Sequence, residues 1–209
     1  MNKPKIILIG AGGHCHSCID VIEQQGKYDI AGLIGMPDEI NSQVLGYKVI
    51  GSDSDLPRIA EEYQYALITV GQISSPHCRI RLYEYAASLG LQFPVIVSPY
   101  AHVARGVPIG PGTIVMHGAI INSGSSIGEN CLINSRALIE HDVTVHAHCH
   151  ISTGAILNGN VSVGWGSFVG SGSIVKEGLQ LGHECLIGMG VSVRHNVLDR
   201  SKCVGSGKI

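Results

Sequence analysis

The sequence has few charged side chains and few aromatic ones. Charged residues make up 14% of the 209 residues and aromatic residues 5%, and the formal net charge is −2. No basic cluster is present that would favour nucleic acid or an anionic lipid surface. No apolar run reaches the roughly 18 residues that a membrane-spanning helix needs. We therefore expect a protein that binds neither nucleic acid nor membrane.

Features of exported proteins are lacking as well. The apolar run that follows Lys5 is too short for the hydrophobic region of a signal peptide, so we expect a cytoplasmic protein. Seven cysteines are an odd number in a long chain, which favours reduced thiols over a disulfide framework. Cys15 and Cys18 form a CxxC pair, but no second pair completes a zinc site.

Apolar strands and helical segments alternate in the first half of the chain. The pattern predicts a Rossmann-like α/β domain over residues 1–98. The expected strands are Lys5–Ile9, Asp29–Ile34, Ala66–Val70 and Phe93–Val97, and the expected helices are Cys15–Gln25, Ser54–Glu62 and Pro76–Leu89.

A six-residue repeat occupies residues 99–195, which we take as a second domain followed by a tail at 196–209. Every sixth residue from Val103 to Val193 is aliphatic, without an exception. A step of six scatters over the faces of an α-helix, but it fits a solenoid of short strands with one inward aliphatic each. Three such edges make an 18-residue triangular coil.

Small residues and glycine complete the repeat. The residue two before each aliphatic is mostly small or apolar and is expected inside the coil, as at Cys131 and Cys149. The residue directly after the aliphatic is often Gly or Asn, as at Gly128 and Asn134. We expect left-handed backbone at these following positions, because Gly and Asn tolerate it best.

This sequence resembles the hexapeptide-repeat sugar acetyltransferases typified by the sialic acid O-acetyltransferase and the bacillosamine-pathway N-acetyltransferase. The motifs that carry the resemblance are Ile6–His14, Gly46–Leu56, Val70-Gly71, Asn134–Asp142, Ile151–Gly164 and Phe168–Ser171. It implies a left-handed parallel β-helix, acetyl-CoA as co-substrate without a metal, a sugar or nucleotide-sugar substrate, and a homotrimer.

His141 is the candidate catalytic residue. It lies two residues after the inward Ile139, so its side chain should point outward. A surface histidine is usually no more than that, but the resemblance implies that His141 is the general base. A histidine that titrates near neutral pH suits this role. Asp142, which the resemblance favours, or Glu140 would orient it.

The resemblance also implies the ligand contacts. For acetyl-CoA these are His150, Gly159, Ser171 and Met189, and the 18-residue spacing places Thr153, Ser171 and Met189 in one column. For the substrate they are Gly12, Gly13, His14 and Gly71. The glycine-rich loop follows a strand and opens a helix, as at phosphate sites. Gly35-Met36 supplies neither the acidic residue expected for NAD nor the Asp pair of many relatives.

Two other chemistries are disfavoured. His141 and His146 have the five-residue spacing of β-helix carbonic anhydrases, but Arg105 stands at the place of the third ligand and arginine does not bind zinc. A cysteine nucleophile is also disfavoured. The cysteines at 131, 149 and 185 share one inward column with Ser167, as packing residues do.

We thus expect transfer of acetyl to the amine of a nucleotide-linked amino sugar, for surface glycan such as lipopolysaccharide or capsule. The alternatives are O-acetylation of a sialic-acid-like sugar and a non-catalytic nucleotide-sugar scaffold.

Overall fold

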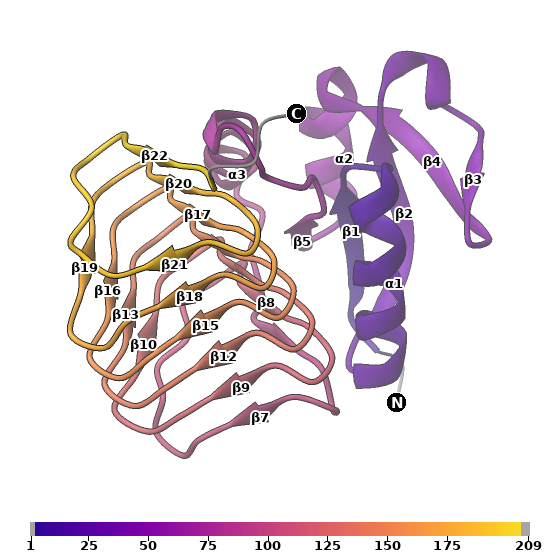
Figure 1. Ribbon diagram of the computed structural model, residues 1–209. Helices are drawn as coiled ribbons and strands as arrows, with labels where there is room; N and C mark the ends of the chain where they lie inside the picture. Colours follow the sequence, from indigo (N-terminus) through magenta and orange to yellow (C-terminus); the bar gives the residue numbers. More distant parts are fainter. Residues whose placement is uncertain (1–2, 206–209) are drawn as a thin grey trace. The chain divides into compact units, whose positions relative to one another are not determined.

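The computed structural model describes residues 3–205, and the chain divides into two compact units. The first contains the chain up to Gly71 together with His77–Pro99, and the second contains Gln72–Pro76 together with the chain from Tyr100 onward. The first unit is made of strands and helices, and the second is a stack of coils (Figure 1). No helix within residues 3–205 is long and apolar enough to cross a membrane.

The first unit is an α/β sheet, as the alternating pattern predicts. Its strand order is β3-β4-β2-β1-β5, parallel except for the β3–β4 pair. The strands of this sheet are β1 (Lys5–Ile9), β2 (Asp29–Gly35), β3 (Gln43–Val44), β4 (Tyr47–Ser52) and β5 (Tyr65–Ile68). The first unit also contains β6 (Ile96–Val97), which is not part of this sheet. The helices are α1 (Gly13–Gln25), α2 (Leu56–Glu62) and α3 (His77–Ser88), with short 3₁₀ turns η1 (Pro37–Glu39) and η2 (Asp53–Asp55).

Three strands differ from the expectation, and the first is β3, a two-residue strand that was not predicted. Strand β4 was not predicted, because its sequence lacks a long apolar run and ends in Gly51 and Ser52. The strand expected at Phe93–Val97 is confined to β6, since Pro94 has no N–H to donate to a ladder. The formation of β4 and β6 as strands depends on their pairing and packing with other segments more than on their own amino-acid composition.

The second unit is a parallel β-helix of three sheets, in which paired strands lie 18 residues apart except for β20 and β22, which lie 16 apart. One sheet contains β8 (Ile114–Val115), β11 (Leu132–Ile133), β14 (His150–Ile151), β17 (Phe168–Val169), β20 (Leu186–Ile187) and β22 (Lys202–Cys203). The next contains β7 (His102–Val103), β9 (Ile120–Ile121), β12 (Leu138–Ile139), β15 (Ile156–Leu157), β18 (Ile174–Val175) and β21 (Ser192–Val193). The third contains β10 (Ser126–Ile127), β13 (Thr144–Val145), β16 (Ser162–Val163) and β19 (Gln180–Leu181).

Two segments fall outside the simple division expected from the sequence. Gln72–Pro76 belongs to the second unit by its contacts. Strand β22 pairs with β20 in parallel, and therefore continues its sheet into the residues expected to form a tail. The boundaries expected after residues 98 and 195 remain predictions.

The aliphatic column forms the core of the β-helix. Every member from Val115 to Val193 is buried, and only Val103 and Ile109 at the first turns are half-buried. Burying one Val, Leu or Ile side chain contributes about 1.5–3 kcal/mol. The repeat therefore stabilises each coil against its neighbours.

The corners correct one expectation. Left-handed backbone occurs at every sixth residue from Gly106 to Gly190, with φ between 49° and 81°, which is three residues after the aliphatic and not one. The glycines directly after the aliphatic residue instead allow the backbones of neighbouring coils to approach closely. A Cβ on Gly164 would collide with the backbone of Gly182, and one on Gly170 with that of Gly188. The space between coils, not the backbone angle, explains these glycines.

The outward side chains differ between sheets. One sheet presents Ser126, Thr144, Ser162 and Gln180. The sheet of β9, β12, β15 and β18 presents an apolar stripe, which we define as Ile120, Leu138, Ile156 and Ile174. Ile120 is 40% exposed and Ile174 is 42% exposed. The described chain thus leaves one apolar face of the prism open to solvent.

Candidate active site

His141 and Asp142 form a contact on the turn between β12 and β13. The His141 ring is exposed, as its register predicts, and its Nδ1–H donates to Asp142 Oδ2 at 2.9 Å. Asp142 has left-handed backbone, with φ of 59°. A carboxylate on Nδ1 selects the tautomer whose Nε2 carries a lone pair directed away from the carboxylate. This nitrogen can accept a proton from a reacting group.

The structure shows which of the two candidate carboxylates contacts His141. Asn122, one coil earlier, donates from Nδ2 to Glu140 Oε2 at 3.0 Å. Glu140 is thereby held by the preceding coil, and Asp142 makes the histidine contact. The shorter aspartate reaches the imidazole.

Gly159 lies directly beneath the His141 ring in the next coil. A Cβ at this position would come within 2.7 Å of both Cε1 and Nε2 of His141. The lack of a side chain lets the imidazole lie over the following coil. Sequence reasoning assigned Gly159 to acetyl-CoA, and the structure also places it against the candidate base.

A groove runs along this corner of the prism. One hollow of about 480 Å³ is lined by Glu140, His141, Asn158, Gly159, Asn160, Glu177 and Gly178. A second hollow of about 500 Å³ is lined by Asn158, Ile174, Lys176, Glu177, Ser192, Val193, Arg194 and His195. The two hollows share Asn158 and Glu177 and therefore adjoin each other. Sequence reasoning missed Lys176 and Arg194, although counting by 18 from His141 leads to 177 and 195.

The column of Thr153, Ser171 and Met189 exists, but on a different corner. The N–H groups of Gly172 and Gly190 donate to the carbonyls of Thr153 and Ser171, each at 2.9 Å, so the column stacks coil on coil. Met189 is 82% exposed. The sheet of β12, β15 and β18 separates this corner from the His141 corner within the chain. One copy of the chain therefore does not bring Met189 to His141.

His150 is enclosed in this chain and 6% exposed. Its Nδ1–H donates to the Gln72 carbonyl, and its Nε2 lies 3.3 Å from Asn134 Nδ2. Gln72 in turn donates from Nε2 to the carbonyls of His148 and Gly166, at 3.1 and 3.2 Å. His150 thus fastens Gln72–Pro76 to the β-helix, and its predicted contact with acetyl-CoA stays a prediction.

The remaining histidines of this region make structural contacts. His148 is buried with its Nδ1 3.0 Å from Asn130 Nδ2, and the ring centroid of His146 lies 6.5 Å from that of His183. Residues 3–205 contain no group of three or more His, Cys, Asp or Glu side chains arranged to hold a metal ion.

Three cysteines of the β-helix, Cys131, Cys149 and Cys185, are buried in a column of hydroxyl and thiol side chains. Thr113, Cys131, Cys149, Ser167 and Cys185 occupy one inward column, and each donates to a carbonyl in the following coil. Burial raises the pKa of the Cys149 thiol well above its usual value. Neutral thiols held in this way are poor nucleophiles.

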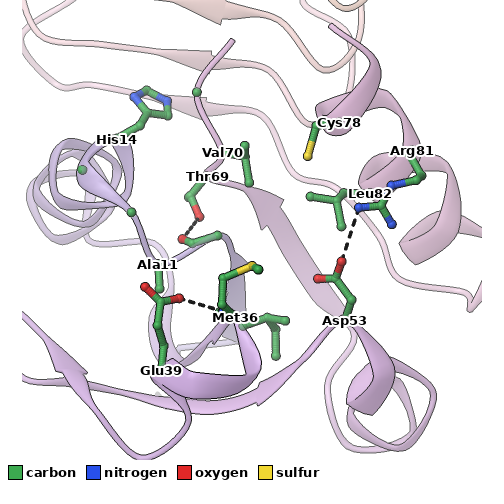
Figure 2. A pocket seen from close by; sticks show the side chains of 16 residues that line it. Ala11, His14, Met36, Glu39, Asp53, Thr69, Val70, Cys78, Arg81 and Leu82 are labelled. Carbon is green, nitrogen blue, oxygen red and sulfur yellow. Dashed lines mark hydrogen bonds and ion pairs between the residues drawn. The ribbon is translucent and has the colours of Figure 1, made fainter. Parts of the chain in front are cut away.

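The four predicted substrate residues line one cavity in the first unit. The cavity measures about 330 Å³, and Gly12, Gly13, His14 and Gly71 all border it (Figure 2). Helix α1 begins at Gly13 after the glycine-rich loop. Thr69 holds this loop by donating from Oγ1 to the Gly10 carbonyl at 2.6 Å. Backbone N–H groups at the start of a helix favour a phosphate.

Charged residues that sequence reasoning missed lie farther round the cavity. Glu39 accepts from the Met36 N–H at 2.7 Å, and Arg81 pairs with Asp53 at 3.5 Å. Figure 2 shows the Asp53–Arg81 pair across the cavity from His14. These side chains come from η1, η2 and α3, which are distant in sequence. Strand β4 had to be recognised before Asp53 could be placed.

The CxxC pair contributes packing near this cavity. Cys15 and Cys18 are both buried in α1. Burial raises the pKa of Cys15 to about 11 and raises that of Cys18 further. The pair is therefore protonated at neutral pH.

Three family descriptions match the chain. Residues 5–86 match the PglD N-terminal domain, residues 124–159 match the bacterial transferase hexapeptide (six repeats), and residues 160–194 match the hexapeptide repeat of succinyl-transferase. Curated protein sequences give no match.

Solved structures are similar over nearly the whole chain. A variant of perosamine N-acetyltransferase from Caulobacter crescentus, in complex with CoA and GDP-perosamine, is 30% identical with a TM-score of 0.90, covering 96% of this chain and 93% of that one. The acetyltransferase domain of PglB from Neisseria gonorrhoeae FA1090, in complex with acetyl coenzyme A, is 29% identical with a TM-score of 0.87 and 96% of both chains covered. WeeI from Acinetobacter baumannii AYE, at 20% identity and a TM-score of 0.83 with 96% and 97% covered, has the same fold.

Proposed function

The chain belongs to the PglD/NeuD-type hexapeptide sugar acetyltransferases, and we propose that it acetylates the amine of a nucleotide-linked amino sugar. It is an acetyltransferase that uses acetyl-CoA, and its repeats form a left-handed parallel β-helix. In our proposal His141 is the general base, Asp142 orients it, the enzyme works in the cytoplasm, and the product enters surface-glycan synthesis.

The observation that carries the proposal is the His141–Asp142 contact at an open groove. The sugar amine must be neutral to attack the thioester, and Nε2 of His141 accepts the proton that it loses. The amine nitrogen bonds to the thioester carbonyl carbon, the C–S bond breaks, and CoA leaves as a thiolate. The proton held by His141 then passes to that sulfur. Asp142 stabilises the imidazolium in between.

The groove suits a long, anionic acetyl donor. Three coil steps separate His141 from His195, which is about 14 Å at the spacing of parallel strands. Lys176 and Arg194 border the far end of the groove. We assign the thioester to the His141 end and the phosphates of CoA to these two cations, which attract phosphate oxygens.

A second copy of the chain completes this site in our proposal. The column of Ser171 and Met189 lies on another corner, so these residues reach acetyl-CoA only from a neighbouring copy. The apolar stripe between the two corners gives association a hydrophobic driving force. A closed threefold ring places the Met189 corner of each copy against the His141 corner of the next. We therefore propose a homotrimer.

The first-unit cavity is the proposed site for the nucleotide. The α1 N-terminus at Gly12 and Gly13 receives the diphosphate, with His14 and Gly71 beside it. The perosamine N-acetyltransferase described above carries GDP-perosamine, which is a nucleotide-linked amino sugar. This class of substrate has phosphates of the kind that the cavity suits and an amine of the kind that the proposed reaction acetylates.

O-acetylation of a free sialic-acid-like sugar is the second candidate. It is favoured by Gly35-Met36, where many relatives have an Asp pair. Glu39 and Asp53 nevertheless border the same cavity and provide carboxylates there.

A thiol-release assay separates the candidates. Acetyl-CoA is offered with UDP-, GDP- and dTDP-linked 4-amino sugars and with free nonulosonic acids, and the wild-type chain is compared with His141→Ala. We expect CoA release with a nucleotide-linked amino sugar and its loss in the variant. Release with the free acids alone would overturn N-acetylation. No release with any sugar would favour the scaffold.

A further inference from the structure

Ser125 interrupts an apolar column inside the β-helix. Counting by 18, the inward positions on its column are Val107, Ser125, Val143, Val161 and Leu179. Ser125 is 2% exposed, so its hydroxyl is removed from bulk water. A buried hydroxyl needs partners, because leaving one unpaired costs about 1–3 kcal/mol.

The Ser125 hydroxyl holds both ends of the turn that carries His141 and Asp142. It donates to the Glu140 carbonyl at 2.7 Å and accepts from the Val143 N–H at 3.1 Å. These two backbone groups flank His141 and Asp142 directly. One side chain thus ties the start and the end of the turn to the preceding coil.

The neighbours of Ser125 serve the same turn. Asn122 binds Glu140, as described above, and so keeps that carboxylate away from His141. Gly124 has φ of 77°, and a Cβ there would collide with the carboxylate of Asp142. The segment from Asn122 to Ser125 therefore provides both the ties and the space that the His141–Asp142 contact requires.

Other turns show that coil stacking alone does not call for this hydroxyl. Thr113 and Ser167 make the same double contact, but in a column whose members are all hydroxyl or thiol side chains. In the column of Ser125, Val143 and Val161 occupy the equivalent places in the next two coils and are buried without a hydroxyl. Within this column the hydroxyl occurs only at Ser125, and the coil that follows Ser125 bears the candidate base.

We infer that Ser125 is a positioning residue, which fixes the turn so that Asp142 stays within hydrogen-bonding distance of His141 Nδ1. The inference rests on the proposed function of His141. Ser125 would affect catalysis through His141 and Asp142, so its replacement should change turnover more than substrate binding.

The test uses an isosteric pair. Ser125→Val removes the hydroxyl and restores the apolar column, and Ser125→Thr keeps the hydroxyl at the same volume as Val. We expect the Val variant to lose about tenfold or more in kcat, with KM for both substrates within about twofold, because small misplacements of a catalytic group are costly. The Thr variant should keep wild-type turnover. Ser167→Val, which breaks the same double contact at another turn, is the matched control and should also keep it.

An NMR measurement reads the contact without turnover. In ¹⁵N-histidine-labelled protein, the Nδ1–H resonance of His141, assigned with His141→Ala, should be present in the wild type and the Thr variant and lost or shifted in the Val variant. An unchanged resonance and an unchanged kcat in Ser125→Val would overturn the inference, as would equal losses in Val and Thr. If Ser125→Val does not fold, Ser125→Ala replaces it. Absence of activity in the wild type would refute the proposed function alone, since the resonance still reports on Ser125.

Discussion

The two units present their candidate functional residues in different ways. In the β-helix, His141, Gly159, Glu177 and His195 follow one another at a step of 18, so one corner of a regular prism becomes a groove. In the α/β unit the cavity is bordered by the loop after β1, by η1, by η2 and by α3. A repeat makes a site readable by counting, whereas an α/β cavity has to be assembled from segments that are distant in sequence. Removal of single side chains should show the difference.

The largest expected effect is a loss of turnover when His141, on one corner of the β-helix, is replaced. His141→Ala should lower kcat by about 10²–10⁴-fold, the usual contribution of a general base. The melting temperature should stay near that of the wild type, because the side chain is 63% exposed. Steady-state kinetics and thermal unfolding measure the two quantities. His102→Ala, at an exposed histidine on β7, is the control, and an equal loss in that variant would contradict the assignment.

Gly159→Ala tests whether the His141 ring must lie over Gly159 for the enzyme to be active. The added Cβ must displace the imidazole, since it would lie 2.7 Å from Nε2. We expect kcat to fall about tenfold with little loss of stability, because the clash is with an exposed side chain. Gly188→Ala adds a Cβ with contacts of 3.4 Å and longer and should retain activity. Full activity in Gly159→Ala would show that the imidazole does not act from this position.

Two arginine variants distinguish the nucleotide-sugar site proposed in the α/β unit from the acetyl-CoA site proposed in the β-helix. Arg81→Ala, in the α/β cavity, should raise KM for the nucleotide sugar about tenfold and leave KM for acetyl-CoA unchanged, since one charged hydrogen bond contributes about 1.5–3 kcal/mol. Arg194→Ala, in the β-helix groove, should do the reverse, with an effect that weakens as salt is added. Arg58→Ala removes an exposed ion pair with Glu62 and serves as control. If both arginine variants altered KM for the same substrate, the assignment of the two sites would be wrong.

The smallest expected effect concerns stability at alkaline pH. Burial raises the pKa of Cys15 from 9.0 to about 11 and raises that of Cys18 as well. Between these values the unfolded chain loses a thiol proton that the folded chain keeps, so stability should fall as pH rises from about 9 to about 11. Urea unfolding of the wild type and of a Cys15→Ala, Cys18→Ala double variant should show a flatter pH dependence in the variant. Parallel curves would contradict the effect of burial on these thiols.

Much of the β-helix could be predicted from its sequence. The aliphatic column, the inward cysteines and the outward His141 all follow from a register in which each residue repeats the environment of the one 18 earlier. The corner geometry did not follow, because Gly128 and Gly164 are required by the approach of the next coil, which a φ preference does not describe. Asn122, Gly124 and Ser125 were missed for the same reason, since their partners lie one coil away.

Less of the α/β cavity could be predicted. The loop of Gly12, Gly13 and His14 is local and was found, and Gly71 lines the same cavity. Asp53 and Arg81 were not found, because they meet only when β4 pairs with β2 and α3 packs on the sheet. No periodicity connects positions 53 and 81.

The sequence by itself determined the two classes of architecture, the burial of the ladder and the outward direction of His141, because each depends on a local hydrophobic period. Only the tertiary structure decided that Asp142 and not Glu140 contacts His141. That choice rests on Asn122 holding one carboxylate, on Gly124 leaving room for the other, and on Ser125 tying the turn between them. These are interactions between coils, and hydrogen bonds across 15 to 20 residues leave no mark in the local pattern.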